Sequence, residues 1–148
     1  MRAVLQRVSR AQVTSAGRVL GRIGRGFVVL LGVARGDTER DAEFLADRTL
    51  KMRVFADADG KMNLALADIG GALLVVSQFT LLADTESGRR PSFTAAAPPA
   101  DANRLYQYFL SLVRSGDVKV ESGEFGAAME LELVNDGPVT IILDSRNR

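Results

Sequence analysis

Apolar and polar positions along the chain follow two repeating patterns, one typical of strands and one typical of helices. Strands are expected where apolar residues alternate with polar ones or form a short unbroken run. Such stretches cover residues 3–13, 19–23, 27–33, 53–55, 72–79, 118–120, 129–133 and 139–143. Helices are expected at 38–50 and 101–114, where apolar residues recur every three or four positions. This set of elements predicts an α+β domain with a mostly antiparallel sheet.

Length and composition predict one compact unit. The chain has 148 residues, of which 47% are hydrophobic, enough to form a single core. We therefore expect one domain over residues 1–148. The sequence contains no apolar run that approaches a membrane span, no signal-peptide segment and no cysteine. A cytoplasmic location without membrane attachment is expected.

The absence of histidine and cysteine narrows the chemistry. Ser-His-Asp and Cys-His catalysis are excluded, as is a zinc site made of cysteine and histidine. Asp57-Ala58-Asp59-Gly60 resembles part of a calcium loop, but Phe55 and Leu66 would then occupy two of its ligand positions. We interpret this segment as a turn and expect neither a metal nor a cofactor.

Charge is distributed unevenly, although the net charge is only +1. Residues 1–36 contain seven arginines and no acidic residue, and arginine makes up 16 of the 19 basic residues. A face that binds nucleic acid would give this pattern, since arginine suits bidentate phosphate contacts. Arginine-rich codon usage and solvated strand faces would give it too, and the sequence leaves both interpretations open.

Two polar segments interrupt or follow strands and are candidates for a site. Ser77-Gln78-Phe79-Thr80 ends an apolar strand, where either a site or a simple exit to the surface is expected. The segment from Asn135 to Thr140 lies between two strands and contains Gly137-Pro138. From these residues alone a hairpin turn is the favoured interpretation. The alternative is that Gly137-Pro138 presents backbone carbonyls to a ligand.

Taken together, these two segments resemble the paired motifs of the D-aminoacyl-tRNA deacylase family. Further segments that resemble this family lie along the whole chain, at residues 6–8, 60–63, 90–93 and 123–129. The resemblance implies a homodimer whose subunits have a curved, barrel-like sheet flanked by two helices. It also implies that the Gly137-Pro138 bond is cis and that this loop enters the active pocket of the partner subunit.

The resemblance implies hydrolysis of the ester of D-aminoacyl-tRNA, and of mischarged glycyl-tRNA, with the aminoacylated 3′ end of tRNA as partner and no DNA. The hydroxyl of Thr80 is an unsuitable nucleophile, because the chain has no histidine to activate it. In the family, the 2′-hydroxyl of the terminal adenosine assists attack by water. We therefore assign the backbone N–H groups of Phe79 and Thr80 to the ester, and Ser77 and Gln78 to the adenosine pocket.

Selectivity is expected to come from steric exclusion. If the carbonyls of Gly137 and Pro138 crowd the position of an L side chain, only D-residues and glycine can bind. We expect Arg7 to hold this loop by bonding a carbonyl, although an ordinary surface arginine would look the same in sequence. Met129 is assigned to substrate binding.

Three other functions are compatible with parts of the sequence. A non-catalytic RNA-binding module would use the arginine-rich strands, but only 6% of residues are aromatic and no strand carries an exposed aromatic cluster for base stacking. A self-associating structural protein would use the Gly137-Pro138 loop in its interface. A metal-dependent hydrolase would need clustered carboxylates, and the acidic residues here are scattered.

Overall fold

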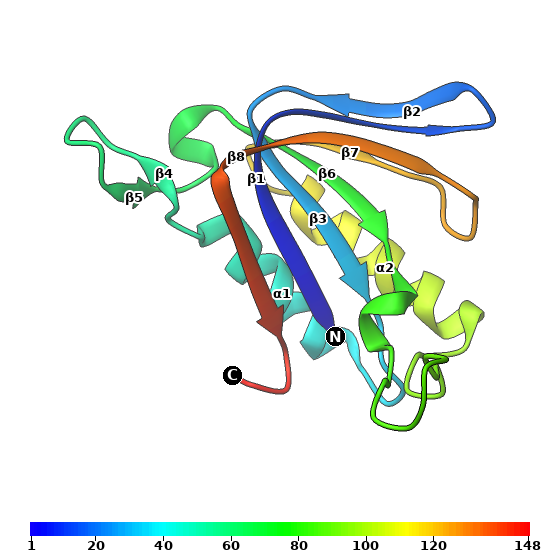
Figure 1. The fold of residues 1–148 in the computed structure, drawn as a ribbon. Helices are drawn as coiled ribbons and strands as arrows, with labels where there is room; N and C mark the ends of the chain where they lie inside the picture. Colours follow the sequence, from blue (N-terminus) through cyan, green and yellow to red (C-terminus); the bar gives the residue numbers. More distant parts are fainter.

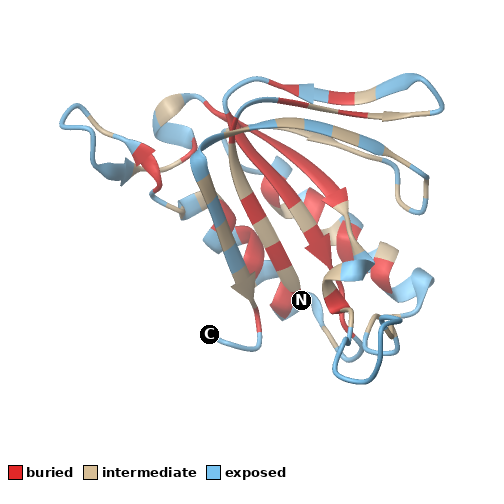
Figure 2. Ribbon diagram, viewed as in Figure 1, coloured by how far each residue is buried: buried red, intermediate tan, exposed pale blue.

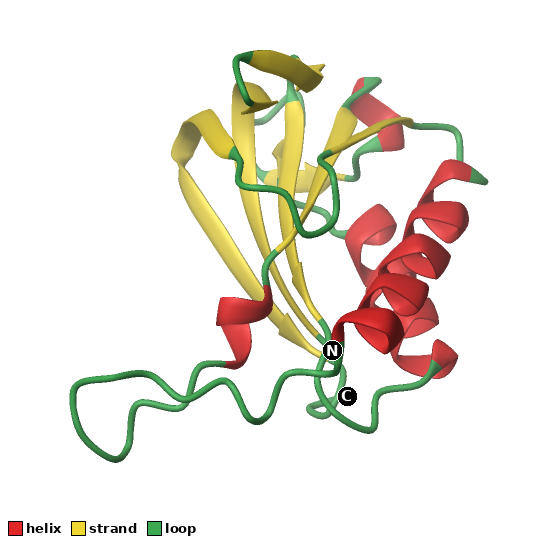
Figure 3. Ribbon diagram, turned by 90° about the vertical axis from the view of Figure 1, so that its right-hand side faces the viewer, coloured by secondary structure: helices red, strands yellow, loops and turns green.

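The computed structural model describes residues 1–148, which form a strongly curved sheet with two long helices on one face (Figures 1 and 3). The sheet runs in the order β2-β1-β3-β6-β7, and β8 pairs with the other edge of β1. A separate two-stranded sheet joins β4 and β5. The elements are β1 (Arg2–Ser15), β2 (Arg18–Ile23), β3 (Gly26–Gly32), α1 (Glu39–Lys51), β4 (Phe55–Ala56), β5 (Met62–Leu64), η1 (Ala67–Ile69), β6 (Ala72–Ser77), η2 (Phe79–Leu82), α2 (Pro99–Arg114), β7 (Lys119–Ser122) and β8 (Glu130–Asp144).

The sheet is mixed: most strand pairings are antiparallel, as predicted, but the strand β6 has parallel neighbours, which was not predicted. β1 pairs antiparallel with β2, β3 and β8, whereas β6 runs parallel to both β3 and β7. The connection from β3 to β6 contains α1, and the connection from β6 to β7 contains α2. A helical crossover returns the chain to the same end of the sheet, so the next strand runs parallel.

The core lies in two parts on opposite faces of the curved sheet, since alternate residues of β3 and β6 belong to different clusters. Buried residues are concentrated in these central strands and in the helices behind them (Figure 2). The larger part fills the space between the sheet and the helices and includes Leu5, Phe27, Leu73 and Phe109. The smaller part lies inside the curve, where β2 and the first half of β8 bend over β6; Leu74 belongs to this part. The curved sheet is therefore nearly closed into a barrel.

Both predicted helices are present. The Thr38 hydroxyl accepts the N–H of the third helical residue of α1, Asp41, and the Asp41 carboxylate accepts the Thr38 N–H, which forms a capping box. In α2 the fully buried tyrosine is Tyr106, whereas Tyr108 is only partly buried. Tyr108 instead donates from its hydroxyl to Glu43 of α1 at 2.8 Å. No helix is long and apolar enough to cross a lipid bilayer.

The segment around Gly137-Pro138 is not a hairpin turn, which corrects the favoured interpretation. β8 continues in one direction along β1, with Asn135 opposite Val8 and Thr140 opposite Gln6. Between these two pairs, β8 advances by five residues and β1 by only two. The extra residues of β8 therefore form a bulge. The Gly137-Pro138 peptide bond within the bulge is cis.

Pairing between β1 and β8 explains much of the uneven charge. Arg2 pairs with Asp144 at 3.1 Å, Arg7 with Asp136 at 3.5 Å, and Arg10 with Glu132 at 3.4 Å. The basic first strand therefore lies against the acidic last strand. These arginines are used inside the fold, and they do not form a free basic face.

Candidate functional site

The end of β6 and the short helix η2 form the first wall of the site. Ala72 to Val76 are buried, and the strand ends at Ser77, two residues earlier than predicted. The Gln78 N–H still donates to the Leu31 carbonyl of β3 at 2.8 Å, after which the chain turns into η2. The amides of Phe79 and Thr80 open this helical turn, so they have no acceptor within the turn itself.

Gly32 allows η2 to lie close to β3. A Cβ atom on Gly32 would lie 2.6 Å from Cδ2 of Leu82 and 2.9 Å from the Gln78 carbonyl oxygen. Because the carbonyl belongs to the backbone, a larger residue would move the whole turn. This role could not be predicted from the sequence, since it depends on a contact between two distant segments.

A mainly apolar cleft of about 670 Å³ opens beside this turn. Its walls come from the ends of β3 and β6, the segment 93–99, the start of α2 and the segment 125–131. Aromatic rings form two contacts in the lining. Phe79 and Phe93 meet edge to face with centroids 5.0 Å apart, and Tyr106 and Phe125 are 5.8 Å apart. A cleft of this size with aromatic walls fits a planar ring system.

The exposure and polarity of the rings differ along the cleft. Phe79 is 57% exposed at the rim, whereas Tyr106 is buried at the base. The Tyr106 hydroxyl donates to the Val75 carbonyl at 3.1 Å. Burial raises the pKa of Tyr106 to about 12, against the opposing charge of Arg114. The tyrosine is therefore a neutral wall residue at physiological pH.

The structure places four of the predicted site residues in this cleft, namely Ser77, Gln78, Phe79 and Met129. Thr80 is exposed and does not line the cleft, and its hydroxyl accepts a hydrogen bond from the Gln78 side-chain amide. Nowhere in the structure do three or more histidine, cysteine, aspartate or glutamate side chains gather in an arrangement that would hold a metal ion.

Arg7, Gly137 and Pro138 lie outside the cleft of their own chain. Nε of Arg7 donates to the Asp136 carbonyl at 3.1 Å, and Nη1 donates to the Val54 carbonyl at 2.6 Å. Gly137 has φ +128°, and a Cβ there would lie 2.8 Å from Cγ2 of Val139. The Asn135 side chain also accepts the Val139 N–H at 3.1 Å. The bulge is therefore held from several sides, and Gly137 and Pro138 are exposed at its tip.

Several cleft residues were missed by the sequence analysis, including Arg35, Ala97, Pro98 and Phe125. Pro98 and Ala97 belong to a stretch of small residues, 95–99, which carries no motif of its own. Alanine and proline at 95–99 leave room for a cleft between β3 and α2, which is the one signal that the sequence offered. Arg35 was counted only as part of the basic N-terminal region.

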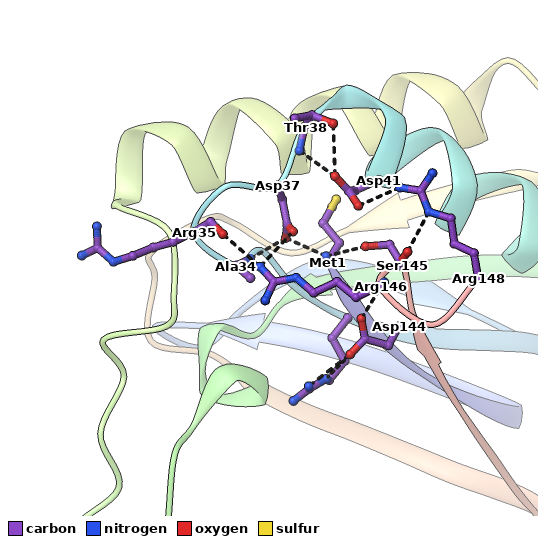
Figure 4. A network of polar contacts seen from close by, with 11 residues as sticks. Met1, Ala34, Arg35, Asp37, Thr38, Asp41, Asp144, Ser145, Arg146 and Arg148 are labelled. Carbon is purple, nitrogen blue, oxygen red and sulfur yellow. Dashed lines mark hydrogen bonds and ion pairs between the residues drawn. The ribbon is translucent and has the colours of Figure 1, made fainter.

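A polar network holds the segment that carries Arg35 (Figure 4). The Asp37 carboxylate accepts the Ala34 N–H at 2.6 Å and pairs with the amino group of Met1 at 2.6 Å. Nε of Arg35 donates to the Thr94 carbonyl at 2.7 Å, and the Arg35 carbonyl accepts from Arg146 at 2.9 Å. These contacts fix the position of Arg35 at the wall of the cleft.

Known proteins similar to this chain cover it from end to end. A protein from Dehalococcoides mccartyi named D-aminoacyl-tRNA deacylase is 59% identical over 148 residues, which is 100% of this chain and 97% of that protein. One of the same name from Anaeromyxobacter dehalogenans is 60% identical over 146 residues, or 99% of this chain and 98% of that protein.

Two solved structures have a similar fold. One, described as c-Myc DNA Unwinding Element Binding Protein, has a TM-score of 0.92 and 41% identity, covering 97% of this chain and 98% of its own. The other, described as a probable eukaryotic D-amino acid tRNA deacylase, has a TM-score of 0.79 at 20% identity, covering 96% and 97%, and shows the fold alone. The family model for D-Tyr-tRNA(Tyr) deacylase matches residues 4–144. The chain therefore belongs to the D-Tyr-tRNA(Tyr) deacylase family.

Proposed function

We propose that this protein hydrolyses the ester bond of D-aminoacyl-tRNA and releases free D-amino acid and tRNA. The observation that carries the proposal is the aromatic cleft beside the turn of Phe79 and Thr80, in a chain that belongs to this family. The cleft has the size for a terminal adenosine with its amino acid. Ser77 and Gln78 supply polar groups on one wall.

Backbone groups, not a side-chain nucleophile, are proposed to promote the reaction. An aminoacyl ester is already activated, so positioning and electrostatic stabilisation supply much of the rate increase. Water adds to the ester carbon, the amides at Phe79 and Thr80 stabilise the negative charge on the carbonyl oxygen, and the bond to the 3′ oxygen breaks. The neighbouring 2′-hydroxyl assists the water, and the departing 3′ oxygen takes up a proton. The exposed Thr80 hydroxyl is bonded only to the Gln78 amide, which cannot act as a base.

Chiral selection is proposed to use the bulge of a second subunit. Gly137 and Pro138 do not reach the cleft of their own chain, so they would contribute to a site only across a homodimer. The outer side of β8, which has no strand beyond it, exposes Ile142 by 69% and Val134 by 40%. Apolar residues on a free strand edge favour contact with another chain. Carbonyls of Gly137 and Pro138 would then exclude an L side chain, while glycine, which has none, would be accepted.

The hydrolysis step is tested by measuring tyrosine release from D-Tyr-tRNA by the purified protein with chelator present. A matched substrate should end in 2′-deoxyadenosine, with the ester on the 3′ oxygen. We expect fast release from the first and release near the spontaneous rate from the second. Equal rates on both would contradict the role of the 2′-hydroxyl, and no release from either would contradict the proposed activity. Binding of tRNA without release would instead favour a non-catalytic RNA-binding module.

The same preparation can be tested for glycine release and for its oligomeric state. We expect Gly-tRNA to be hydrolysed, because the steric exclusion acts on a side chain that glycine lacks. We also expect sedimentation velocity to give the mass of two chains. A monomer that is fully active and chirally selective would contradict the contribution of Gly137 and Pro138 from a partner subunit.

A further inference from the structure

Most arginines of this chain are engaged within the fold. Twelve of the sixteen make a hydrogen bond, an ion pair or a contact with an aromatic ring. The four that do not are Arg18, Arg40, Arg89 and Arg90, and all four are exposed. Arg18 lies at a hairpin tip and Arg40 on α1, whereas Arg89 and Arg90 are neighbours.

Arg89 and Arg90 lie on a projecting loop, residues 84–92, which we call the arginine arm. Asp84 and Ser92 close its base through two backbone hydrogen bonds, both 2.8 Å long. Residues 84–91 are exposed, and the loop that follows η2 extends away from the sheet in Figure 3. Pro91 favours an extended backbone at Arg90. The two arginines are thus held away from the body of the protein with their guanidinium groups free.

The arginine arm stands on the rim of the cleft. One limb begins directly after η2, which carries Phe79, and the other leads directly into Phe93. Phe79 and Phe93 contact each other with centroids 5.0 Å apart, and both line the cleft. Three residues span at most about 11 Å, so the Cα atom of Arg90 lies within that distance of the Cα atom of Phe93, whose ring borders the cleft. Phe79 is 57% exposed at this rim, so a polynucleotide whose last nucleoside occupies the cleft can leave it past the arm.

The acids of the arm do not neutralise its arginines. The Asp84 carboxylate accepts a hydrogen bond from the nearby Glu86 N–H at 2.9 Å. Neither Asp84 nor Glu86 forms an ion pair with Arg89 or Arg90. Free guanidinium groups are suited to phosphate, which they bind with two parallel hydrogen bonds.

We propose that Arg89 and Arg90 bind the phosphodiester backbone of the tRNA strand that leads to the aminoacylated 3′ end. This inference rests on the proposed function, because that function places the terminal adenosine in the cleft. The arm adds affinity for a polynucleotide without taking part in ester cleavage. A substrate that consists of the terminal nucleoside alone has no phosphate group that the arginine arm could bind.

The test compares Arg89→Gln/Arg90→Gln with the control Arg18→Gln/Arg40→Gln, which removes the same charge from the other two free arginines. Binding of uncharged tRNA(Tyr) is measured by fluorescence anisotropy between about 50 and 200 mM salt. We expect the arm variant to bind about tenfold more weakly at the upper salt concentration. Its plot of log affinity against log salt should be shallower by about 1.4, that is about 0.7 for each lost single-strand phosphate contact. Arg89→Lys/Arg90→Lys should keep the wild-type slope.

Hydrolysis supplies the second readout. For the arm variant, kcat/KM on D-Tyr-tRNA should fall about tenfold, in step with its affinity. The same variant should hydrolyse the 3′ ester of D-tyrosine with adenosine at the wild-type rate. Melting temperatures unchanged from wild type confirm that the variants are folded, as expected for exposed loop residues.

Two results would overturn the arginine arm as a phosphate contact. In one, the arm variant binds tRNA with wild-type affinity and slope. In the other, it loses no more than the Arg18→Gln/Arg40→Gln control, which would reflect net charge alone. A wild-type protein that hydrolyses neither ester would contradict the proposed function, and the binding comparison would still decide the role of the arm.

Discussion

Arg7 binds the main chain of Asp136 and thereby joins the first strand to the bulge that carries Gly137 and Pro138. Its Nε lies 3.1 Å from the Asp136 carbonyl oxygen, and its Nη1 lies 2.6 Å from that of Val54. The Arg7 side chain is only 14% exposed. One guanidinium therefore fixes two segments that are far apart in sequence, and it does so through backbone groups that any change of loop position would disturb.

Replacing Arg7 with lysine should impair the enzyme, because an ammonium cannot reproduce two directed bonds from one planar group. Each lost hydrogen bond contributes about 1 kcal/mol, so kcat/KM on D-Tyr-tRNA should fall about thirtyfold. The control is Arg10→Lys, since Arg10 and Glu132 are both 65% exposed and their pair contributes little. Equal activity of the two variants would contradict a positioning role for Arg7.

Alanine at Gly137 should change activity more than serine at Thr80. The new Cβ would lie 2.8 Å from Cγ2 of Val139 and 3.0 Å from Nη2 of Arg7, at a φ of +128° that L-residues rarely adopt. The resulting shift of the bulge should lower kcat/KM on D-Tyr-tRNA about tenfold or raise hydrolysis of L-Tyr-tRNA. Thr80→Ser keeps the hydroxyl and should stay near the wild-type rate.

Gly60→Ala provides the control for backbone strain at Gly137. Gly60 also has a positive φ, +75°, but its Cβ would meet nothing within 4 Å. Its activity and selectivity should match those of the wild type. An inactive Thr80→Ser beside a normal Gly137→Ala would overturn the assignment of roles to these two residues.

Gly32→Ala should lower both stability and activity. Its Cβ would lie 2.9 Å from the Gln78 carbonyl oxygen, so the turn of Phe79 and Thr80 must move. Overpacking of this kind costs about 1–3 kcal/mol, which corresponds to a fall in Tm of about 3–10 °C. Differential scanning calorimetry measures the shift, with Gly24→Ala as the control because a Cβ there would meet nothing within 4 Å. A Tm equal to that of the control would show that η2 does not depend on close contact with β3.

Asp41 should stabilise the fold at pH values above the ordinary pKa of its carboxyl group, 3.8, and should lose this effect at pH values below it. Burial alone would raise the pKa of this carboxyl, but hydrogen bonds from Thr38 and Ser145 outweigh burial and lower it well below its usual value of 3.8. The ionised form is therefore favoured in the folded state, and this stabilisation is lost as the pH falls below that value.

Asp41→Asn should accordingly lower Tm by about 3 °C at neutral pH, the size expected for a lost helix cap. The difference from wild type should shrink as the pH falls below 3.8. The control Asp47→Asn removes an exposed pair with Lys51 and should change Tm little at either pH. A difference for Asp41→Asn that persists unchanged in acid would contradict the ionic role of this carboxylate.

The sequence predicted the elements well where local periodicity determines them. The buried stripe of α1, including Ala42, Leu45 and Thr49, follows directly from its spacing. The alternation of Leu131 and Leu133 with exposed Glu132 is also as predicted. The resemblance to the family is confirmed by the family model, which covers residues 4–144.

The errors concern contacts between distant segments. Nothing local to Asn135 and Thr140 shows that both residues pair with β1, so a bulge was taken for a hairpin turn. The parallel pairing of β6 was recoverable, because helices separate it from β3 and β7. The place of Arg35 in the cleft depends on Thr94 and was not recoverable from its neighbours in sequence.

Release of tyrosine from D-Tyr-tRNA and from L-Tyr-tRNA, measured in parallel with purified protein and chelator, tests the central claim most directly. We predict rapid release from the D-ester, while the L-ester decays at its spontaneous rate. Equal release from both esters would contradict exclusion of the L side chain by Gly137 and Pro138. Release from neither would contradict the deacylase activity itself.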